Sequence, residues 1–238
     1  GSPDSGGYDS KEIADRLRAV FPRGRVLIVI REQQQMILAS YNQAVKGGAN
    51  TTLSEYLHRP QPDKFKHPLF EFGRFEYDRL IAYYQRLFGP EQVLVLPFEM
   101  LRSEPRDYVG TIVEFAGLDA DSNLLDELNY GQVANPSLTW QSVELFRRLN
   151  GVVTAPSQHV PHTTLPLHIS HRKIKRGLYT LERKLLPAAW LADRNQARRQ
   201  KLLSEIDEQI YGMYGASNRR LAELTGLDLA TYGYDLDD

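Results

Sequence analysis

The clearest pattern in the chain is a short, continuous apolar run close to its start. Residues 26–30 have the sequence Val-Leu-Ile-Val-Ile and lie between Arg25 and Arg31. A run of this length, rich in β-branched residues, predicts a strand that is buried on both faces of a parallel sheet. Open α/β sheets bind ligands outside the carboxyl ends of their strands. We therefore expect Arg31, which directly follows the strand, to face a ligand.

Helical periodicity surrounds this strand and leads to a second one. A helix whose capping box is formed by Asp9 and Glu12 is expected before the strand. Further helices are predicted to end at Gly47, to span residues 53–57 and to span about 75–88. The second apolar run, residues 92–96, is again typical of a buried strand. This alternation predicts a parallel sheet with right-handed crossovers.

The C-terminal half of the chain is predicted to be rich in helices. A loop excursion is expected over residues 151–170 and a helical part over residues 171–238. Only two strands are recognisable in the sequence, which is fewer than a doubly wound sheet usually has. The remaining strands would come from before residue 1, from weakly patterned segments, or from another chain.

Composition narrows the choice of function classes. The chain has 238 residues, a formal net charge of -1 and no cysteine. The charge gives no overall field that would attract nucleic acid, and the missing thiols exclude disulfides, zinc–thiolate sites and thiol catalysis. No apolar run approaches the length of a membrane helix, and no signal-peptide core is recognisable. A cytoplasmic location is therefore expected.

Most familiar catalytic motifs are missing from the sequence. There is no Gly-x-Ser-x-Gly nucleophile motif and no Walker-type phosphate loop. The six histidines lack the spacing and the acidic partner of a metal site, so no metal is predicted.

Three anion-binding features remain. The first is Arg31 with Ser40, because a guanidinium and a hydroxyl on the following helix suit a phosphate; pairing of Arg31 with Glu32 is the alternative. The second is a basic block that starts at Arg172 and Lys173. That block fits a solvated helix face, a phosphate clamp, a contact with an acidic glycan, or a helix on anionic lipid. The third is a helix start at residues 135–137, where capping is an equal explanation.

Several segments together resemble the sulfotransferases that use 3′-phosphoadenosine 5′-phosphosulfate. The strand–Arg–helix unit is similar to the element of that family that binds the 3′-phosphate, and later segments match further landmarks in order and spacing. These segments are Leu17–Pro22, Val26–Tyr41, Tyr84–Leu101, Glu104–Pro105, Glu114–Leu118, Tyr214–Leu221 and Gly226–Tyr234. The C-terminal segments are similar to bacterial and carbohydrate-type members.

The resemblance implies a fold, a reaction and a set of binding residues. The fold would be a P-loop-NTPase-like three-layer α/β sandwich with a parallel sheet. The reaction would transfer a sulfuryl group from 3′-phosphoadenosine 5′-phosphosulfate to a hydroxyl or amine of a small-molecule or carbohydrate acceptor, without a metal. Arg31, Ser40, Arg172 and Lys173 would bind the donor.

The chain departs from the family pattern in two places. It lacks the N-terminal Lys-x-Gly-Thr-Thr loop that holds the 5′-phosphosulfate, and no general base is recognisable before Arg31, since Glu12 fits a helix cap. We therefore expect residues 1–238 to be one sulfotransferase-like domain that is truncated at its N-terminus. In addition, the family serine stands eight residues after the arginine, where this chain has Ala39, and Ser40 is rotated by about 100° around the helix.

Two alternatives to an active enzyme stay open at this point. One is a sulfotransferase-like domain without turnover that binds a nucleotide or an acidic glycan. The other is a module that contacts a membrane or a partner through residues 172–190, where leucines and Trp190 alternate with basic residues.

Overall fold

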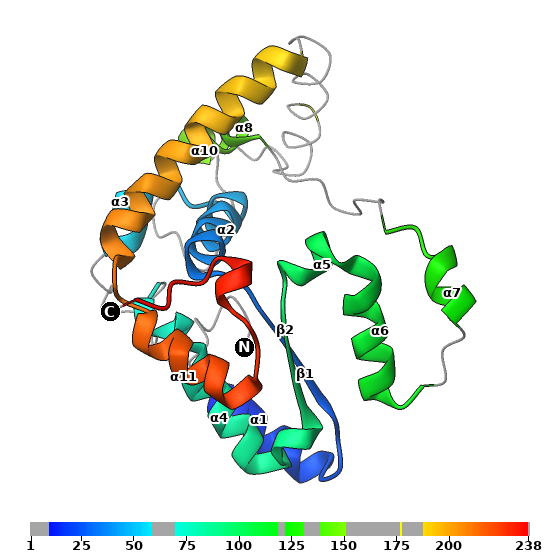
Figure 1. Cartoon of the computed structure of the whole chain (residues 1–238). Coiled ribbons are helices and arrows are strands. Elements are labelled where there is room, and N and C mark those ends of the chain that lie inside the picture. The colour runs from blue at the N-terminus through cyan, green and yellow to red at the C-terminus, as the bar shows by residue number, and fades with distance from the viewer. Residues whose placement is uncertain are drawn as a thin grey trace. The chain divides into compact units, whose positions relative to one another are not determined.

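The computed structural model describes residues 10–58, 70–118, 122–130, 139–150, 177 and 188–237. These ranges contain many helices and a small parallel sheet of two strands, which confirms the predicted helix-rich α/β class (Figure 1). The elements are α1 (Ser10–Val20), β1 (Val26–Ile30), α2 (Gln33–Lys46), α3 (Leu53–His58), η2 (Phe72–Phe75), α4 (Tyr77–Phe88), η3 (Pro90–Gln92), β2 (Val93–Pro97), α5 (Met100–Ser103), α6 (Pro105–Ala116), α7 (Ser122–Glu127), α8 (Trp140–Asn150), α10 (Ala188–Ile210), α11 (Gly215–Thr225) and η4 (Ala230–Tyr232).

The chain divides into two compact units. The first combines residues 1–33, 61–133 and 210–238, and the second combines residues 34–60 and 134–209. The sheet and the helices that pack on it belong to the first unit. The second unit is built from helices in the part that the structure describes.

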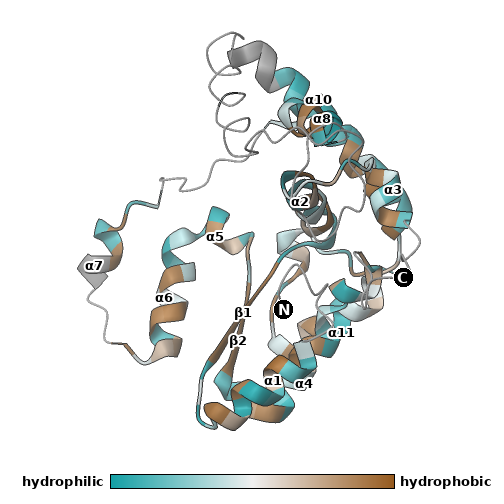
Figure 2. Cartoon of the chain, turned by 180° about the vertical axis from the view of Figure 1, so that it is seen from behind, coloured by the Kyte–Doolittle hydropathy of each residue, from teal (hydrophilic) through white to brown (hydrophobic). Residues whose placement is uncertain are grey.

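Strands β1 and β2 form the parallel pair that the sequence predicts. Val26 lies opposite Val93 and Ile30 lies opposite Pro97. Figure 2 shows both strands in the brown of hydrophobic residues. Nevertheless, Leu27 and Val29 of β1 are 40% and 47% exposed. The prediction that β1 is buried on both faces is therefore wrong. An apolar run shows which residues are hydrophobic, but it does not show which elements pack against each face of the strand.

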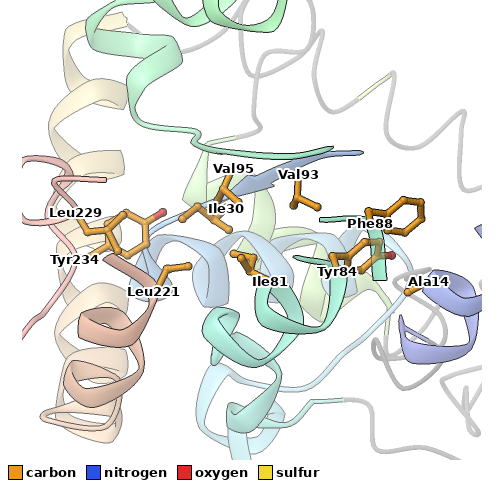
Figure 3. Packing of buried hydrophobic residues seen from close by; sticks show 10 residues of the cluster. All are labelled: Ala14, Ile30, Ile81, Tyr84, Phe88, Val93, Val95, Leu221, Leu229 and Tyr234. Atoms are coloured by element: carbon orange, nitrogen blue, oxygen red, sulfur yellow. The ribbon is translucent and has the colours of Figure 1, made fainter. Parts of the chain in front are cut away.

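The core of the first unit lies between the sheet and α4. Ile81, Tyr84 and Phe88 recur at helical spacing along α4 and face apolar residues of both strands. Helices α1 and α11 extend this layer through Ala14 and Leu221 (Figure 3). The turn after α4 needs a glycine, since Gly89 has a φ of 93°, which other residues rarely adopt. The buried residues are Ala14, Ile30, Ile81, Tyr84, Phe88, Val93, Val95, Leu221, Leu229 and Tyr234.

The second unit has a core of its own. Buried apolar residues of α2, α3, α8 and α10 form it, and they include Ile37, Leu57, Phe146 and Ile206. The buried side chain of Asn150 donates hydrogen bonds of 2.8 and 2.9 Å to the carbonyl oxygens of Val45 and Ala49. Val45 lies in the last turn of α2 and Ala49 follows the helix, so Asn150 joins α8 to the C-terminal end of α2.

Candidate functional site

Arg31 follows the last residue of β1, and Phe98 follows the last residue of β2. The two positions are adjacent because the strands are parallel and in register, and the Phe98 amide donates a 2.7 Å hydrogen bond to the carbonyl of Ile30. The structure thus places Arg31 at the carboxyl edge of the sheet, as the sequence predicts. This is the edge at which α/β proteins bind their ligands.

The ring of Phe98 contacts two guanidinium groups at this edge. The guanidinium carbon of Arg31 lies 5.2 Å from the ring centroid, and that of Arg102 lies 5.4 Å from it. Both distances suit a cation–π interaction, which favours a defined position of the charged group. Arg102 comes from α5, a single helical turn that the sequence patterns do not reveal. The only sequence signal for it is the spacing of four residues from Phe98, which places both residues on one side of a helical turn.

The carboxylate of Glu99 ties this edge to the C-terminal segment. One oxygen accepts a hydrogen bond of 3.2 Å from the Glu32 amide, and the other accepts one of 3.4 Å from the hydroxyl of Tyr234. Burial, followed by the nearby Glu99 charge, raises the pKa of the Tyr234 phenol. The phenol therefore stays protonated and remains a donor. Glu99 is engaged through both of its oxygens, which suits a positioning role more than proton transfer.

The backbone that carries Arg31 is fixed by two further contacts. The hydroxyl of Tyr77 donates a 2.7 Å hydrogen bond to the Arg31 carbonyl. Burial raises the pKa of the Tyr77 phenol, so this donor too is retained at neutral and moderately alkaline pH. Two residues further on, the buried Gln33 side chain donates a 2.6 Å hydrogen bond to Asn218. The segment between β1 and α2 is therefore held from α4 and from α11.

This arrangement suits the binding of a phosphate or a sulfate. Guanidinium groups offer several fixed donors that match the oxygens of such anions. Arg31 and Arg102 bring two positive charges to one aromatic ring, and the Glu99 carboxylate at the same edge accepts hydrogen bonds from the Glu32 amide and the Tyr234 hydroxyl. A doubly charged anion would match these two cations.

The other predicted binding residues lie either in the second unit or outside the described residues. Ser40 is half-buried in α2 and belongs to the second unit. Arg172, Lys173 and the helix start at residues 135–137 lie outside the described residues. Their roles therefore stay predictions. Glu12 lies in the first turn of α1 and pairs with Arg16 at 2.5 Å, which fits its interpretation as a residue of a helix start.

A separate cavity of about 510 Å³ lies along β2. It is lined by Gln85, Pro90, Glu91, Val93, Leu94, Val95, Leu96, Met100, Thr111, Leu224, Thr225, Leu227 and Tyr232. The arginine site is not part of it, since neither Arg31 nor Arg102 is among the lining residues. The anion site is thus a feature of the sheet edge and not of this cavity.

The described part of the chain contains neither a candidate metal centre nor a candidate membrane span. Within it, no group of three or more His, Cys, Asp or Glu side chains is arranged to hold a metal ion. No helix in the same ranges combines the length and the apolar character needed to cross a bilayer.

A parallel strand pair with arginines at its carboxyl edge defines an α/β protein with a candidate site for an anionic ligand. Residues 12–122 match the model of the sulfotransferase family, which is a little under half of the chain. The matched segment contains β1, β2 and the arginine site, and over these residues the chain is similar to the sulfotransferase family. The family predicted from the sequence is thereby confirmed over these residues. No curated protein matches the chain.

Proposed function

We propose that this protein transfers a sulfuryl group from 3′-phosphoadenosine 5′-phosphosulfate to a hydroxyl or amine acceptor, carbohydrates included. The family match over residues 12–122 supports sulfuryl transfer as the reaction class. The observation that carries the more specific proposal is the place of Arg31, inside the matched segment and at the carboxyl edge of a parallel sheet. In this proposal Arg31 binds the 3′-phosphate of the donor.

Arg102 is a second candidate for the same phosphate group. Its guanidinium shares the Phe98 ring with that of Arg31, and its side chain is exposed. The 3′-phosphate of the donor carries close to two negative charges at neutral pH, as other phosphate monoesters do. Two guanidiniums would therefore balance its charge. Ser40, Arg172 and Lys173 complete the proposed set of donor-binding residues, and a P-loop-NTPase-like three-layer sandwich is the proposed fold.

Calorimetry with adenosine 3′,5′-bisphosphate tests the site directly. This ligand carries the 3′-phosphate but no sulfuryl group, so it measures binding without turnover. We expect Arg31→Ala to weaken binding by about 1.5–3 kcal/mol, which is the range for hydrogen bonds to charged groups. The matched control is Arg25→Ala, because Arg25 stands just before the first residue of the same strand and contacts the carbonyl of Phe115.

Two outcomes would contradict the assignment of Arg31. One is the absence of binding to the wild-type protein, and the other is equal binding by wild type and Arg31→Ala. An assay with the sulfate donor and a panel of hydroxyl and amine acceptors then tests the reaction itself. Nucleotide binding without any turnover would favour the alternative, a sulfotransferase-like domain that binds its ligand and does not catalyse.

A further inference from the structure

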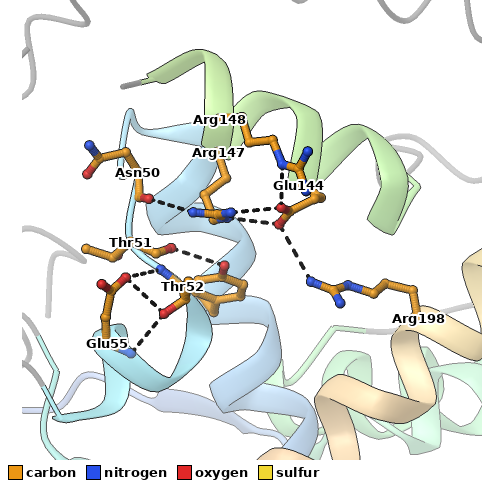
Figure 4. A network of polar contacts seen from close by, with 9 residues as sticks. Asn50, Thr51, Thr52, Glu55, Glu144, Arg147, Arg148 and Arg198 are labelled. Atoms are coloured by element: carbon orange, nitrogen blue, oxygen red, sulfur yellow. Dashed lines mark hydrogen bonds and ion pairs between the residues drawn. The ribbon is translucent and has the colours of Figure 1, made fainter. Parts of the chain in front are cut away.

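A cluster of charges in the second unit contains more cations than its one carboxylate can balance. Glu144 of α8 accepts hydrogen bonds from Arg147 at 2.8 and 2.9 Å and from Arg148 at 2.9 Å. Arg198 of α10 forms an ion pair with the same carboxylate at 3.6 Å. Figure 4 shows Arg148 and Arg198 approaching the Glu144 carboxylate from different sides. Three guanidiniums therefore surround one carboxylate.

The three arginines differ in their burial and in the hydrogen bonds that their guanidinium groups donate. Arg147 is largely buried and also donates a 3.0 Å hydrogen bond to the carbonyl of Asn50. By contrast, the side chains of Arg148 and Arg198 are 72% and 39% exposed. The Arg147 hydrogen bond, and then the other arginines, lower the pKa of Glu144 to about 2. The carboxylate stays charged at neutral pH, and the three arginines outnumber it, although the Glu55 charge also acts on Arg147.

Further cations lie along α10 on both sides of Arg198. Arg194, Arg198 and Lys201 are spaced by four and three residues, so they lie along one side of the helix. At a rise of 1.5 Å per residue they cover about 10 Å of the helix axis. Of the acidic residues of α10, Asp193 stands next to Arg194, and Glu205, Asp207 and Glu208 come after the stripe. The chain as a whole has a formal net charge of -1, so the positive charge of this region differs from the nearly neutral average of the chain.

We propose that this surface, the basic stripe formed by Arg148, Arg194, Arg198 and Lys201, binds an extended acidic polysaccharide. Sulfate and carboxylate groups repeat along such a chain and accept paired hydrogen bonds from guanidinium groups. A row of cations about 10 Å long can meet more than one of these groups at once. The proposal concerns the second unit alone and does not depend on the donor site at Arg31.

The surroundings of the stripe favour a polysaccharide over a membrane or a nucleic acid. A helix that binds lipid needs an exposed apolar face, but Leu202, Leu203 and Ile206 of α10 are buried. Single-stranded nucleic acids bind to exposed aromatic rings on which the bases stack. Among the described side chains of α8 and α10, Trp140 and Phe146 are the aromatic ones, and neither is exposed.

The test uses the full chain and a heparin-type sulfated oligosaccharide, with neutral dextran as the unsulfated comparison. We expect binding that weakens as salt is raised, because exposed charges are screened. Replacing both exposed arginines, Arg148→Ala with Arg198→Ala, should weaken binding by at least about tenfold. Glu144→Gln should tighten binding, since it removes the one negative charge of the cluster.

Three controls separate the stripe from general charge effects and from the donor site. Arg16→Ala removes an exposed arginine that pairs with Glu12 at i,i+4, as Arg148 pairs with Glu144, and it should leave binding unchanged. Arg31→Ala should also leave oligosaccharide binding unchanged, which distinguishes a failure here from a failure of the donor site. Thermal unfolding shows whether each variant is folded, and Arg148→Gln, at the more exposed of the two arginines, gives a milder second test.

Several results would overturn the proposal. They are no binding of the oligosaccharide at low salt, an unchanged affinity in the folded double variant, and an equal loss of affinity in Arg16→Ala. Stronger binding to anionic vesicles or to single-stranded RNA than to the oligosaccharide would assign the stripe to another class of partner.

Discussion

The guanidinium of Arg31 lies over the ring of Phe98, 5.2 Å from its centroid, although 67 residues separate the two in the chain. The contact joins the ends of two parallel strands and holds the proposed phosphate-binding group at the edge of the sheet. An arginine in such a position has lost much of its conformational freedom before a ligand arrives. Less entropy is then lost on binding.

Removing the ring while keeping its apolar volume should therefore weaken ligand binding. We expect Phe98→Leu to reduce the affinity for adenosine 3′,5′-bisphosphate by about 0.5–2 kcal/mol, the range of cation–π interactions. Phe98→Tyr keeps an aromatic face and should bind almost as the wild type does. Calorimetry on the three proteins checks this, and equal affinity in Phe98→Leu and wild type would contradict a positioning role for the ring.

The hydroxyl of Tyr77 offers a second way to disturb the site without touching Arg31. Tyr77→Phe removes the 2.7 Å hydrogen bond to the Arg31 carbonyl and should lower the free energy of unfolding by about 1 kcal/mol. It should also weaken nucleotide binding, because the backbone of Arg31 is then less well fixed. Urea unfolding and calorimetry measure the two effects.

Tyr130→Phe is the matched control for this change. It removes another 2.7 Å hydrogen bond from a phenol to a backbone carbonyl, that of Leu125, which is not among the contacts of the arginine site. Both variants should lose similar stability, and only Tyr77→Phe should lose affinity. Equal affinities in the two variants would show that Tyr77 contributes to stability alone.

The strands and the place of Arg31 could be predicted from the sequence because both depend on local patterns. The apolar runs set β1 and β2, and a residue that follows a strand must lie at its carboxyl end. The surroundings of Arg31 could not be predicted in this way. Phe98, Arg102 and Tyr234 reach the site through tertiary packing, which no local pattern encodes.

The exposure of the side chains of β1 also could not be predicted from the local sequence pattern. The sequence Val-Leu-Ile-Val-Ile is equally apolar at every position, so it predicts burial of both faces. Leu27 and Val29 are nevertheless partly exposed, since burial depends on which elements pack against a face. By contrast, the capping box of Thr52 and Glu55 is a purely local feature, and the structure has both of its hydrogen bonds (Figure 4).

Close packing at the start of α11 makes Gly215 sensitive to any added side chain. A Cβ atom at this position would overlap the backbone oxygen of Asp237, so the C-terminal segment would have to move. Asn218 and Arg219 donate hydrogen bonds of 2.8 and 2.6 Å to carbonyls of the same segment. Gly215→Ala should therefore lower the free energy of unfolding by about 1–3 kcal/mol, the usual cost of overpacking.

The control for this change is Gly110→Ala in the middle of α6. An added Cβ there meets its nearest neighbour at 3.8 Å, an ordinary contact, and alanine favours a helix by about 1 kcal/mol over glycine. Gly110→Ala should thus be neutral or stabilising in urea unfolding. A Gly215→Ala protein as stable as the wild type would show that the C-terminal segment does not pack against α11 in solution.

The low pKa of Glu144 predicts a defined dependence of stability on pH. Its folded-state value of about 2 is below the ordinary value of 4.5, because Arg147 and then the other arginines favour the charged form. The group therefore stabilises the fold fully above about pH 4.5, and this contribution is lost as the pH falls toward 2. Since the side chain is partly exposed, we expect Glu144→Gln to lower the free energy of unfolding by about 1–2 kcal/mol at pH 7.

Urea unfolding of the wild type and of Glu144→Gln at pH 7, 4.5 and 3 checks this prediction. The difference in free energy of unfolding between the two proteins should shrink as the pH decreases. Glu12→Gln, which removes an exposed partner of Arg16, should change stability by less than about 1 kcal/mol at all three values. A difference for Glu144→Gln that is as large at pH 3 as at pH 7 would contradict the assignment of the acid-sensitive contribution to this carboxylate.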